Sequence, residues 1–208
     1  MKIGVMGNIG VGKTTLCRLL KKYYDEKGLN FNIEYECQDE NPYMTDYYND
    51  MKKWAFACQL YFLQKKFDID LKIANRTDNW IVDRIIEEDV FVFAGVQHDI
   101  GNIDDRDWQN YVDVYELMKP HTSDYDIVVY LYSSIENITD NIIKRGRDYE
   151  QKIDVGYIGQ LNNKYEEVAN RLESKGVNIV KVYVEGLDFE HDEDDFDYVI
   201  EKIQEKLK

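Results

Sequence analysis

The chain has 208 residues, of which 44% are hydrophobic and 32% charged. These proportions are typical of one soluble globular domain and exclude a disordered or membrane-embedded chain. The 26 Lys and Arg residues stand against 41 Asp and Glu residues, which gives a formal net charge of −15. Because a negative field repels phosphate backbones and anionic lipids, we expect neither a nucleic-acid partner nor membrane association.

Cysteine usage and the N-terminus bear on the compartment. Cys17, Cys37 and Cys58 form no CxxC pair, a pattern that favours a reduced chain. The first residues lack the apolar core of a signal peptide, and no later run approaches the roughly 18 apolar residues of a membrane span. We therefore expect a cytoplasmic protein.

Short β-branched runs alternate with longer helical stretches, the pattern of a parallel sheet covered by helices. In chain order, the predicted elements are a strand at Lys2–Gly7, a helix at Lys13–Lys27, a strand at Phe31–Glu36, a helix at Asp46–Asn75, a strand at Asn79–Arg84, helices at Ile86–His98 and Asp107–Lys119, a strand at Ile127–Tyr132, helices at Ile135–Arg145 and Asp154–Lys175, a strand at Asn178–Glu185 and a helix at Asp194–Leu207. No linker-like stretch interrupts them, so we predict one α/β domain over residues 1–208.

A glycine-rich motif follows the first predicted strand and opens the first predicted helix. It fits GxxxxGK[ST], in which glycines let successive backbone N–H groups face a polyphosphate. In such a loop Lys13 reaches the β and γ phosphates, and the Thr14 hydroxyl binds Mg²⁺. We predict nucleoside triphosphate binding by Gly7, Asn8, Ile9, Gly10, Val11, Gly12, Lys13, Thr14 and Thr15.

The strand at Asn79–Arg84 ends in an acid followed by a base. Asp83 can support Mg²⁺, and Arg84 can lie against a transferring phosphate, which suits small-molecule phosphoryl transfer. A strand-end salt bridge is the alternative for this pair. A GTPase would need NKxD after a strand, whereas the string Asn163-Lys164-Tyr165-Glu166 falls in a predicted helix.

Further strings occur in order between Gly7 and Tyr157. They are Glu36 followed by Asn41-Pro42-Tyr43, the segment Tyr48–Gln59, Asp83-Arg84 with Asp89 and Phe93, and Arg145-Gly146-Arg147-Asp148-Tyr149-Glu150. With the glycine-rich loop, this set resembles the deoxyribonucleoside kinases, most closely the bacterial deoxyadenosine/deoxyguanosine kinase branch. The resemblance implies the three-layer P-loop kinase architecture with a five-stranded parallel sheet and a helical lid at about residues 145–152. It also implies ATP with Mg²⁺ as the phosphate donor and a homodimer.

The acid Glu36 closes the second predicted strand. Ligands of open α/β sheets lie outside the carboxyl ends of strands, and a carboxylate there can take the proton of an attacking 5′-hydroxyl. The resemblance implies that Glu36 is this general base, with Arg84 and Lys13 acting beside it on the phosphates. An exposed strand-end acid is the alternative.

Helical geometry predicts a polar wall on the helix Asp46–Asn75. At roughly 100° per residue, spacings of eleven and seven residues return Tyr48, Gln59 and Lys66 to within about 20° of one face. The resemblance implies that Tyr48 binds the sugar 3′-hydroxyl and that Gln59 contacts the base edge. Lys66 stands where relatives often carry Arg.

The resemblance also assigns residues from two further segments. Asp89 and Phe93, four residues apart, share a helix face, where Phe93 would stack on the base and Asp89 would read an exocyclic amino group. A core position is the alternative for Phe93. Arg145 and Arg147 would bind phosphate in a closing lid, and Glu150 would bind the 3′-hydroxyl beside Tyr48. A solvated cluster of charges at a helix end is the alternative for the lid.

Together these features predict an ATP- and Mg²⁺-dependent kinase that phosphorylates the 5′-hydroxyl of deoxyadenosine, deoxyguanosine or deoxycytidine. One alternative is a nucleoside monophosphate kinase such as thymidylate kinase, but the acids Glu36 and Glu150 disfavour an acceptor that already carries phosphate. The other alternative is a nucleotide-binding regulatory module without turnover.

Overall fold

The computed structural model describes residues 1–36, 40–147 and 153–208. Its centre is a five-stranded sheet in the order β2-β3-β1-β4-β5, and every neighbouring pair is parallel. The strands are β1 (Lys2–Gly7), β2 (Phe31–Glu34), β3 (Asn79–Asp83), β4 (Ile127–Tyr132) and β5 (Ile179–Tyr183). The predicted five-stranded parallel sheet is confirmed.

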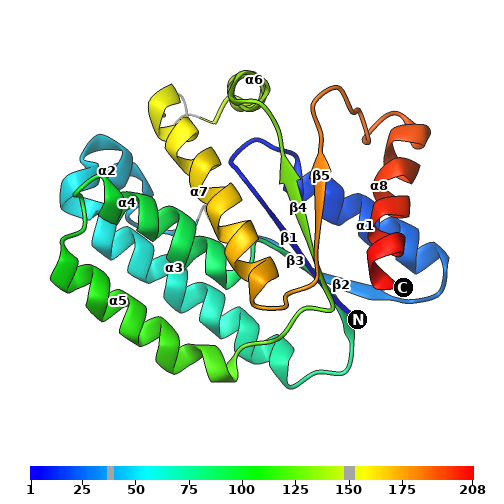
Figure 1. Cartoon of the computed structure of the whole chain (residues 1–208), viewed down its shortest axis with the longest axis horizontal. Coiled ribbons are helices and arrows are strands. Elements are labelled where there is room, and N and C mark those ends of the chain that lie inside the picture. Colours follow the sequence, from blue (N-terminus) through cyan, green and yellow to red (C-terminus); the bar gives the residue numbers. More distant parts are fainter. Residues whose placement is uncertain (37–39, 148–152) are drawn as a thin grey trace.

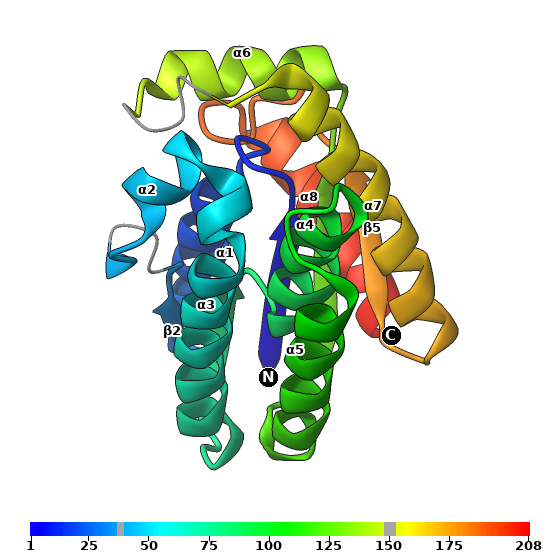
Figure 2. The same ribbon diagram turned by 90° about the vertical axis from the view of Figure 1, so that its left-hand side faces the viewer.

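Helices cover both faces of the sheet (Figures 1 and 2). One face carries α1 (Lys13–Glu26) and α8 (Glu193–Leu207). The other carries α3 (Met51–Ala74), α5 (Asp105–Met118) and α7 (Val155–Ser174), with the short turn η3 (Lys119–His121) after α5. Helix α6 (Ile135–Arg145) crosses the carboxyl ends of the strands (Figure 2). No helix in the described ranges is both long and apolar enough to span a membrane.

Strand β1 is buried on both faces. Ile3 and Val5 pack with Leu16 of α1, whereas Met6 packs on the opposite face with Tyr130 of β4. Parallel strands covered on both faces are continuous apolar runs, which is why Lys2–Gly7 was recognisable from sequence. The rigid strand fixes the start of the glycine-rich loop at the centre of the sheet.

Three strands are shorter than predicted. The edge strand β2 pairs with β3 as far as Glu34 opposite Val82, so Glu36 lies in the following loop and not in the strand. Strand β3 ends at Asp83, because Arg84 has a φ of +74°, a left-handed conformation that no strand continues. At the opposite edge, β5 covers only Ile179–Tyr183.

The prediction of one helix at Asp46–Asn75 is wrong. Helix α2 (Met44–Asn49) ends before Asp50, whose φ of −148° and ψ of 81° are not helical, and α3 begins at Met51. The Asp50 carboxylate accepts a hydrogen bond from the backbone N–H of Lys53 at 3.1 Å. A side chain that bonds nearby backbone competes with the helix interior and favours a cap, so the chain turns at Asp50.

The cap gives a prediction about stability. Replacing Asp50 by Ala should lower the free energy of unfolding by about 1 kcal/mol, the usual effect of losing an N-cap. Urea unfolding followed by far-UV circular dichroism measures this, with Asp50→Asn as a control that keeps a capping oxygen. Equal unfolding midpoints for Asp50→Ala and the wild type would contradict the assignment.

The predicted helix Ile86–His98 is also divided. Residues Glu88–Ala94 form the π-helix η2, and α4 (Gly95–Asp99) follows it. All residues of η2 except Phe93 are buried. π-helical turns are rare and occur frequently at functional sites, and η2 carries two of the predicted substrate residues.

Candidate active site

The glycine-rich loop between β1 and α1 approaches the backbone of β4 closely. Gly7 has a φ of +149°, and a Cβ atom at this position would lie 2.4 Å from the carbonyl oxygen of Leu131. Only glycine can adopt this conformation without a clash. The first glycine of the motif therefore sets the path of the loop.

Polar side chains hold the loop in place. The Asn8 side chain accepts a hydrogen bond from the N–H of Ile9 at 2.8 Å and donates one to the carbonyl of Ile158 in α7 at 3.2 Å. The Lys13 ammonium donates to the Asn8 carbonyl at 2.9 Å. Burial, followed by the positive charge of Arg84, lowers the pKa of Lys13 to about 8. An anionic phosphate beside Lys13 would favour its charged form.

Thr14 and Asp83 meet where α1 begins and β3 ends. The Thr14 hydroxyl donates to Asp83 Oδ2 at 2.6 Å. Asp83 Oδ1 is buried and has no hydrogen-bond partner within the described part of the chain. Mg²⁺ in phosphoryl-transfer sites takes such protein oxygens together with water and substrate phosphates, so the pair fits the metal of a magnesium nucleotide.

Glu36 and Arg84 form an ion pair, with 2.8 Å between Glu36 Oε1 and Arg84 Nε. The Arg84 side chain is 1% exposed, whereas that of Glu36 is 17% exposed. The Arg84 guanidinium also lies over the ring of Phe93, 4.6 Å from its centroid. Glu36 therefore presents a partly open carboxylate, while Arg84 is enclosed.

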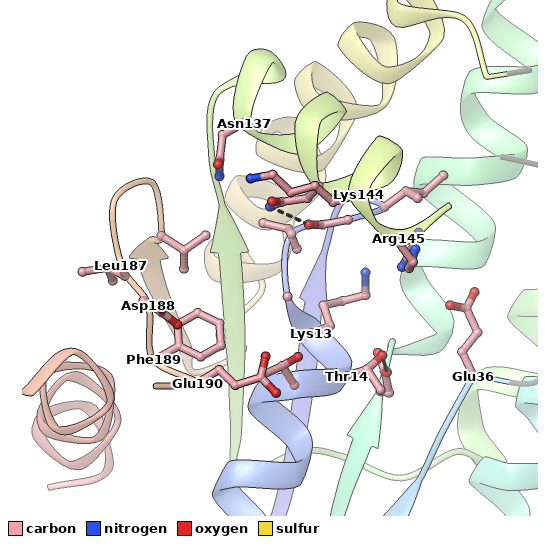
Figure 3. A pocket seen from close by; sticks show the side chains of 18 of the residues that line it. Lys13, Thr14, Glu36, Asn137, Lys144, Arg145, Leu187, Asp188, Phe189 and Glu190 are labelled. Atoms are coloured by element: carbon pink, nitrogen blue, oxygen red, sulfur yellow. Dashed lines mark hydrogen bonds between the residues drawn. The ribbon is translucent and has the colours of Figure 1, made fainter. Parts of the chain in front are cut away.

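A cavity of about 970 Å³ opens above the loop. Its lining includes the loop residues from Ile9 to Thr15, and it brings Glu36 and Arg84 together with Lys144, Arg145 and Arg147 from α6 and the residues that follow it. Figure 3 shows Lys13, Arg145 and Glu36 directed toward one space, with Leu187, Asp188, Phe189 and Glu190 at the other end. The size of the cavity and its cationic lining suit a nucleoside triphosphate.

A second pocket, of about 30 Å³, adjoins the first at Ile9 and Glu36. Besides Glu36, four predicted substrate residues line it, and they come from three elements: Tyr48 from α2, Gln59 from α3, and Asp89 and Phe93 from η2. The remaining lining residues are Met44, Tyr47, Phe62 and Tyr157. Glu36 thus stands between the large cavity above the glycine-rich loop and a pocket with aromatic walls.

Two polar groups of this pocket are suited to reading a base. Gln59 Oε1 is buried without a hydrogen-bond partner among the described residues. Asp89 is 4% exposed, and burial raises the pKa of Asp89 to about 7 against the opposing charge of Lys66. The Asp89 carboxyl therefore changes its protonation state near neutral pH.

Lys66 is buried on the same helix as Gln59, as the predicted polar wall requires, but its hydrogen bond lies at the end of β3. Its ammonium donates to the Asp83 carbonyl at 3.0 Å, and in the part of the chain that the structure covers it lines neither pocket. Tyr48 does lie beside Gln59, but on a separate helix, so helical spacing did not place it. Lys66 supports the end of β3, a role that only the packing of α3 against the sheet reveals.

Two buried residues next to Arg84 were missed from sequence, as were several residues that line the pockets, among them Lys144, Tyr47 and Tyr157. Glu88 is fully buried beside Arg84, and the Tyr165 hydroxyl of α7 donates a hydrogen bond to Glu88 at 3.4 Å. In the sequence Glu88 is one of three consecutive acids and Tyr165 lies within a long helix, so neither carries a local signal of its position. The remaining predicted residue, Glu150, lies outside the described residues, as does most of the predicted lid.

Comparisons with known proteins agree with this geometry. The family model described as deoxynucleoside kinase matches residues 3–208. The chain is 30% identical to a deoxyadenosine/deoxycytidine kinase of Bacillus subtilis, over 97% of this chain and 90% of the relative. It is 32% identical to a deoxyguanosine kinase of Lactobacillus acidophilus, over 99% of this chain and 90% of the relative.

A solved structure is similar over the whole fold. The deoxyadenosine kinase of M. mycoides with bound dATP superposes with a TM-score of 0.83 and 32% identity, covering 98% of this chain and all of the other. A match over nearly the whole of both chains covers the sheet and its helices as well as the glycine-rich loop. The chain therefore belongs to the deoxynucleoside kinase family and is a phosphotransferase that acts on deoxynucleosides.

Proposed function

We propose that the enzyme transfers the γ-phosphoryl group of MgATP to the 5′-hydroxyl of deoxyadenosine, deoxyguanosine or deoxycytidine, in nucleotide salvage in the cytoplasm. The observation that supports this most is the position of Glu36. It lines both the cavity above the phosphate loop and the aromatic pocket, so a hydroxyl held in the pocket would meet a phosphate held by the loop at this carboxylate.

The donor would lie in the larger cavity. Amide groups of the glycine-rich loop and the Lys13 ammonium would hold its phosphates, and Arg145 and Arg147 would close over them. Thr14 and Asp83 would hold Mg²⁺, which neutralises charge on the phosphate oxygens when bound. The loop between β5 and α8 would then lie beside the nucleoside end of the donor, because it forms the far wall of the cavity.

The transfer needs one proton to leave the acceptor. The Glu36 carboxylate would take the 5′-hydroxyl proton while the 5′-oxygen bonds to the γ-phosphorus and the bond to the ADP oxygen breaks. Arg84, paired with Glu36 at 2.8 Å, would place a fixed positive charge beside the transferring group. Both residues would then act at the junction of the two pockets.

The acceptor would enter between α2, α3 and η2, which would have to move apart, because the pocket between them holds only about 30 Å³. Phe93 would stack on the base, Gln59 would bind its edge, and Asp89 would accept a hydrogen bond from an exocyclic amino group. Adenine, guanine and cytosine carry such a group and thymine does not. The B. subtilis and L. acidophilus relatives are named for deoxyadenosine, deoxycytidine and deoxyguanosine, which supports this set of substrates.

The direct test is a coupled assay of ADP release with each of the four deoxynucleosides, their ribonucleosides and their 5′-monophosphates. We expect turnover with amino-bearing deoxynucleosides and little with monophosphates, since the junction presents Glu36 to the incoming 5′ group. Faster turnover with thymidylate than with any nucleoside would indicate a monophosphate kinase instead. Nucleotide binding without acceptor-dependent ADP release would indicate a regulatory module.

The sugar contacts give a second prediction. Tyr48 is proposed to bind the 3′-hydroxyl together with Glu150, a role that the family resemblance implies for both. A substrate without this hydroxyl would leave polar groups of the protein unpaired, at a cost of roughly 1–3 kcal/mol in binding free energy. A 2′,3′-dideoxynucleoside should therefore show kcat/KM about 10-fold or more below that of its deoxynucleoside, and Tyr48→Phe should narrow the gap. Equal kcat/KM for the two nucleosides in the wild type would refute the assignment.

The chain is also proposed to act as one domain and to form a homodimer, as the resemblance to the deoxyribonucleoside kinases implies. Size-exclusion chromatography with light scattering measures the assembly directly. A mass of one chain of 24.7 kDa at micromolar concentration would contradict the proposed dimer.

A further inference from the structure

Arg84 has an unfavourable backbone conformation. Its φ of +74° lies in the left-handed region, which costs free energy for a residue with a Cβ atom. Such residues persist where surrounding contacts determine their position, and they cluster at active sites. The backbone N–H of Arg84 donates to the Val5 carbonyl of β1 at 2.9 Å, so the strained residue is anchored beside the strand that leads into the phosphate loop.

The Arg84 guanidinium has more contacts than the pair with Glu36. Its Nη1 atom donates to the Tyr165 hydroxyl at 2.5 Å and lies 3.5 Å from Glu88 Oε1. The Tyr165 hydroxyl in turn donates to the same Glu88 oxygen at 3.4 Å. Arg84, Glu88 and Tyr165 therefore form a closed triangle behind the face that Arg84 turns toward Glu36.

Glu88 also reaches the phosphate loop. The backbone N–H of Gly7, the first residue of the motif, donates to Glu88 Oε1 at 3.5 Å. One carboxyl oxygen thus collects donors from the loop, from Arg84 and from α7. Glu88 is 0% exposed and lines neither pocket in the described part of the chain, so it can act only through these neighbours.

Burying a carboxylate lowers the stability of the folded protein unless neighbouring groups compensate for the lost hydration. Burial raises the pKa of Glu88 to about 8, against the opposing charges of Arg84 and Lys13. Burial thus favours the protonated form, whose carbonyl oxygen still accepts hydrogen bonds. A glutamine side chain carries the same acceptor in nearly the same shape.

We propose that Glu88 and Tyr165 are positioning residues that fix the Arg84 guanidinium relative to Gly7, so that the arginine and the phosphate loop are held in register for phosphoryl transfer. The inference rests on the proposed action of Arg84 on the transferring group. Neither residue touches substrate: both act through the position of Arg84, and the required property of Glu88 is an acceptor oxygen and not a charge.

The test compares kcat and nucleoside KM for variants that differ in this oxygen. Glu88→Leu, which has no acceptor, should lower kcat by about 10–100-fold with KM changed by less than about threefold, because misplacing a catalytic group by an ångström can cost about 10²-fold. Glu88→Gln should restore kcat to within about threefold of the wild type. Tyr165→Phe, which removes only a hydroxyl, should lower kcat by about tenfold and keeps the test available if Glu88→Leu fails to fold.

Glu87→Leu is the matched control. It makes the same chemical change one residue earlier, at a buried acid paired with Lys119 at 2.6 Å and bonded by Tyr115 at 3.3 Å, away from Arg84. Its kcat should equal that of the wild type. A loss of kcat in this control as large as in Glu88→Leu would overturn the proposal, because any buried acid of this segment would then have the same effect.

A double-mutant comparison separates this inference from the proposed function. Arg84→Ala should lower kcat strongly, and adding Glu88→Leu should lower it no further, because residues that act as a unit are not additive. Wild-type kcat in Glu88→Leu, with Arg84→Ala impaired, would overturn the inference alone. Wild-type kcat in Arg84→Ala would overturn the proposed role of Arg84 and this inference with it. A kcat of Glu88→Gln that is no higher than the kcat of Glu88→Leu would also overturn the inference.

Discussion

Glu36→Gln is expected to lower kcat by about 10²–10⁴, the range that general-base catalysis contributes, while KM for nucleoside and ATP stays within about threefold. Glutamine has nearly the same shape as glutamate and keeps an oxygen at the position that lies 2.8 Å from Arg84 Nε, so the geometry of the pair should persist. Only the ability to take the 5′-hydroxyl proton is lost. Steady-state kinetics with deoxyadenosine and deoxycytidine measure both constants.

Two variants make this result specific. Glu40→Gln removes a nearby acid that is exposed and pairs with Lys65 at 3.5 Å, and it should leave kcat unchanged. Glu36→Asp keeps a carboxylate at a shorter reach and should lie between Glu36→Gln and the wild type. Turnover near the wild-type value in Glu36→Gln would remove Glu36 from the mechanism.

Asp89→Ala is expected to abolish the preference for deoxyadenosine over thymidine. In the wild type, thymidine would leave a buried carboxylate unpaired, and sites built to hydrogen-bond a substrate reject analogues that lack the partner by up to ~10⁴ in kcat/KM. The ratio of kcat/KM for deoxyadenosine and thymidine, measured in both proteins, gives the result. A wild type that prefers thymidine, or a ratio unchanged in Asp89→Ala, would show that Asp89 does not read the base.

The same preference should depend on pH. Burial, opposed by the charge of Lys66, raises the pKa of Asp89 to about 7. The carboxyl is then mostly protonated at pH 6 and mostly ionised at pH 8, and only the ionised form is purely an acceptor. The preference for deoxyadenosine over thymidine should therefore be larger at pH 8 than at pH 6, and Asp89→Ala should remove this difference.

Asp70→Asn provides the control for Asp89. Asp70 is a buried carboxyl on α3 that accepts a hydrogen bond from Tyr125 at 3.3 Å, and burial raises the pKa of Asp70 to about 6. It lines neither pocket in the described ranges. Its replacement should alter stability without altering the ratio between the two nucleosides.

Sequence alone was sufficient to predict the strands of the sheet, several of its helices and the glycine-rich loop. Strands such as Lys2–Gly7 and Ile127–Tyr132 are continuous apolar runs buried on both faces, and the helix Ile135–Arg145 begins at a Ser134 cap and ends at Gly146 with a φ of +68°. These are local signals, carried by neighbouring residues. The glycine-rich motif is equally local, because its spacing encodes the path of a single loop.

Helix boundaries inside long predicted helices were less predictable. The break at Asp50 and the π-helix at Glu88–Ala94 lie in stretches of sequence, 46–75 and 86–94, that contain no glycine or proline to mark a boundary. Both depend on the hydrogen-bond partners of backbone groups: the Asp50 side chain caps α3, and η2 has the i to i+5 hydrogen bonds of a π-helix. Periodicity reports which side chains are apolar and does not report which carbonyl accepts each N–H.

Contacts between distant segments were decided by tertiary structure alone. Lys66 is buried on α3 together with Gln59, yet its ammonium donates to the Asp83 carbonyl rather than reaching the pocket that Gln59 lines. Glu88 gained its place only because η2 brings it under Gly7 and Arg84, while α7 supplies Tyr165. Residue spacing specifies a direction around one helix, whereas the partner found in that direction depends on how separate elements pack on the sheet.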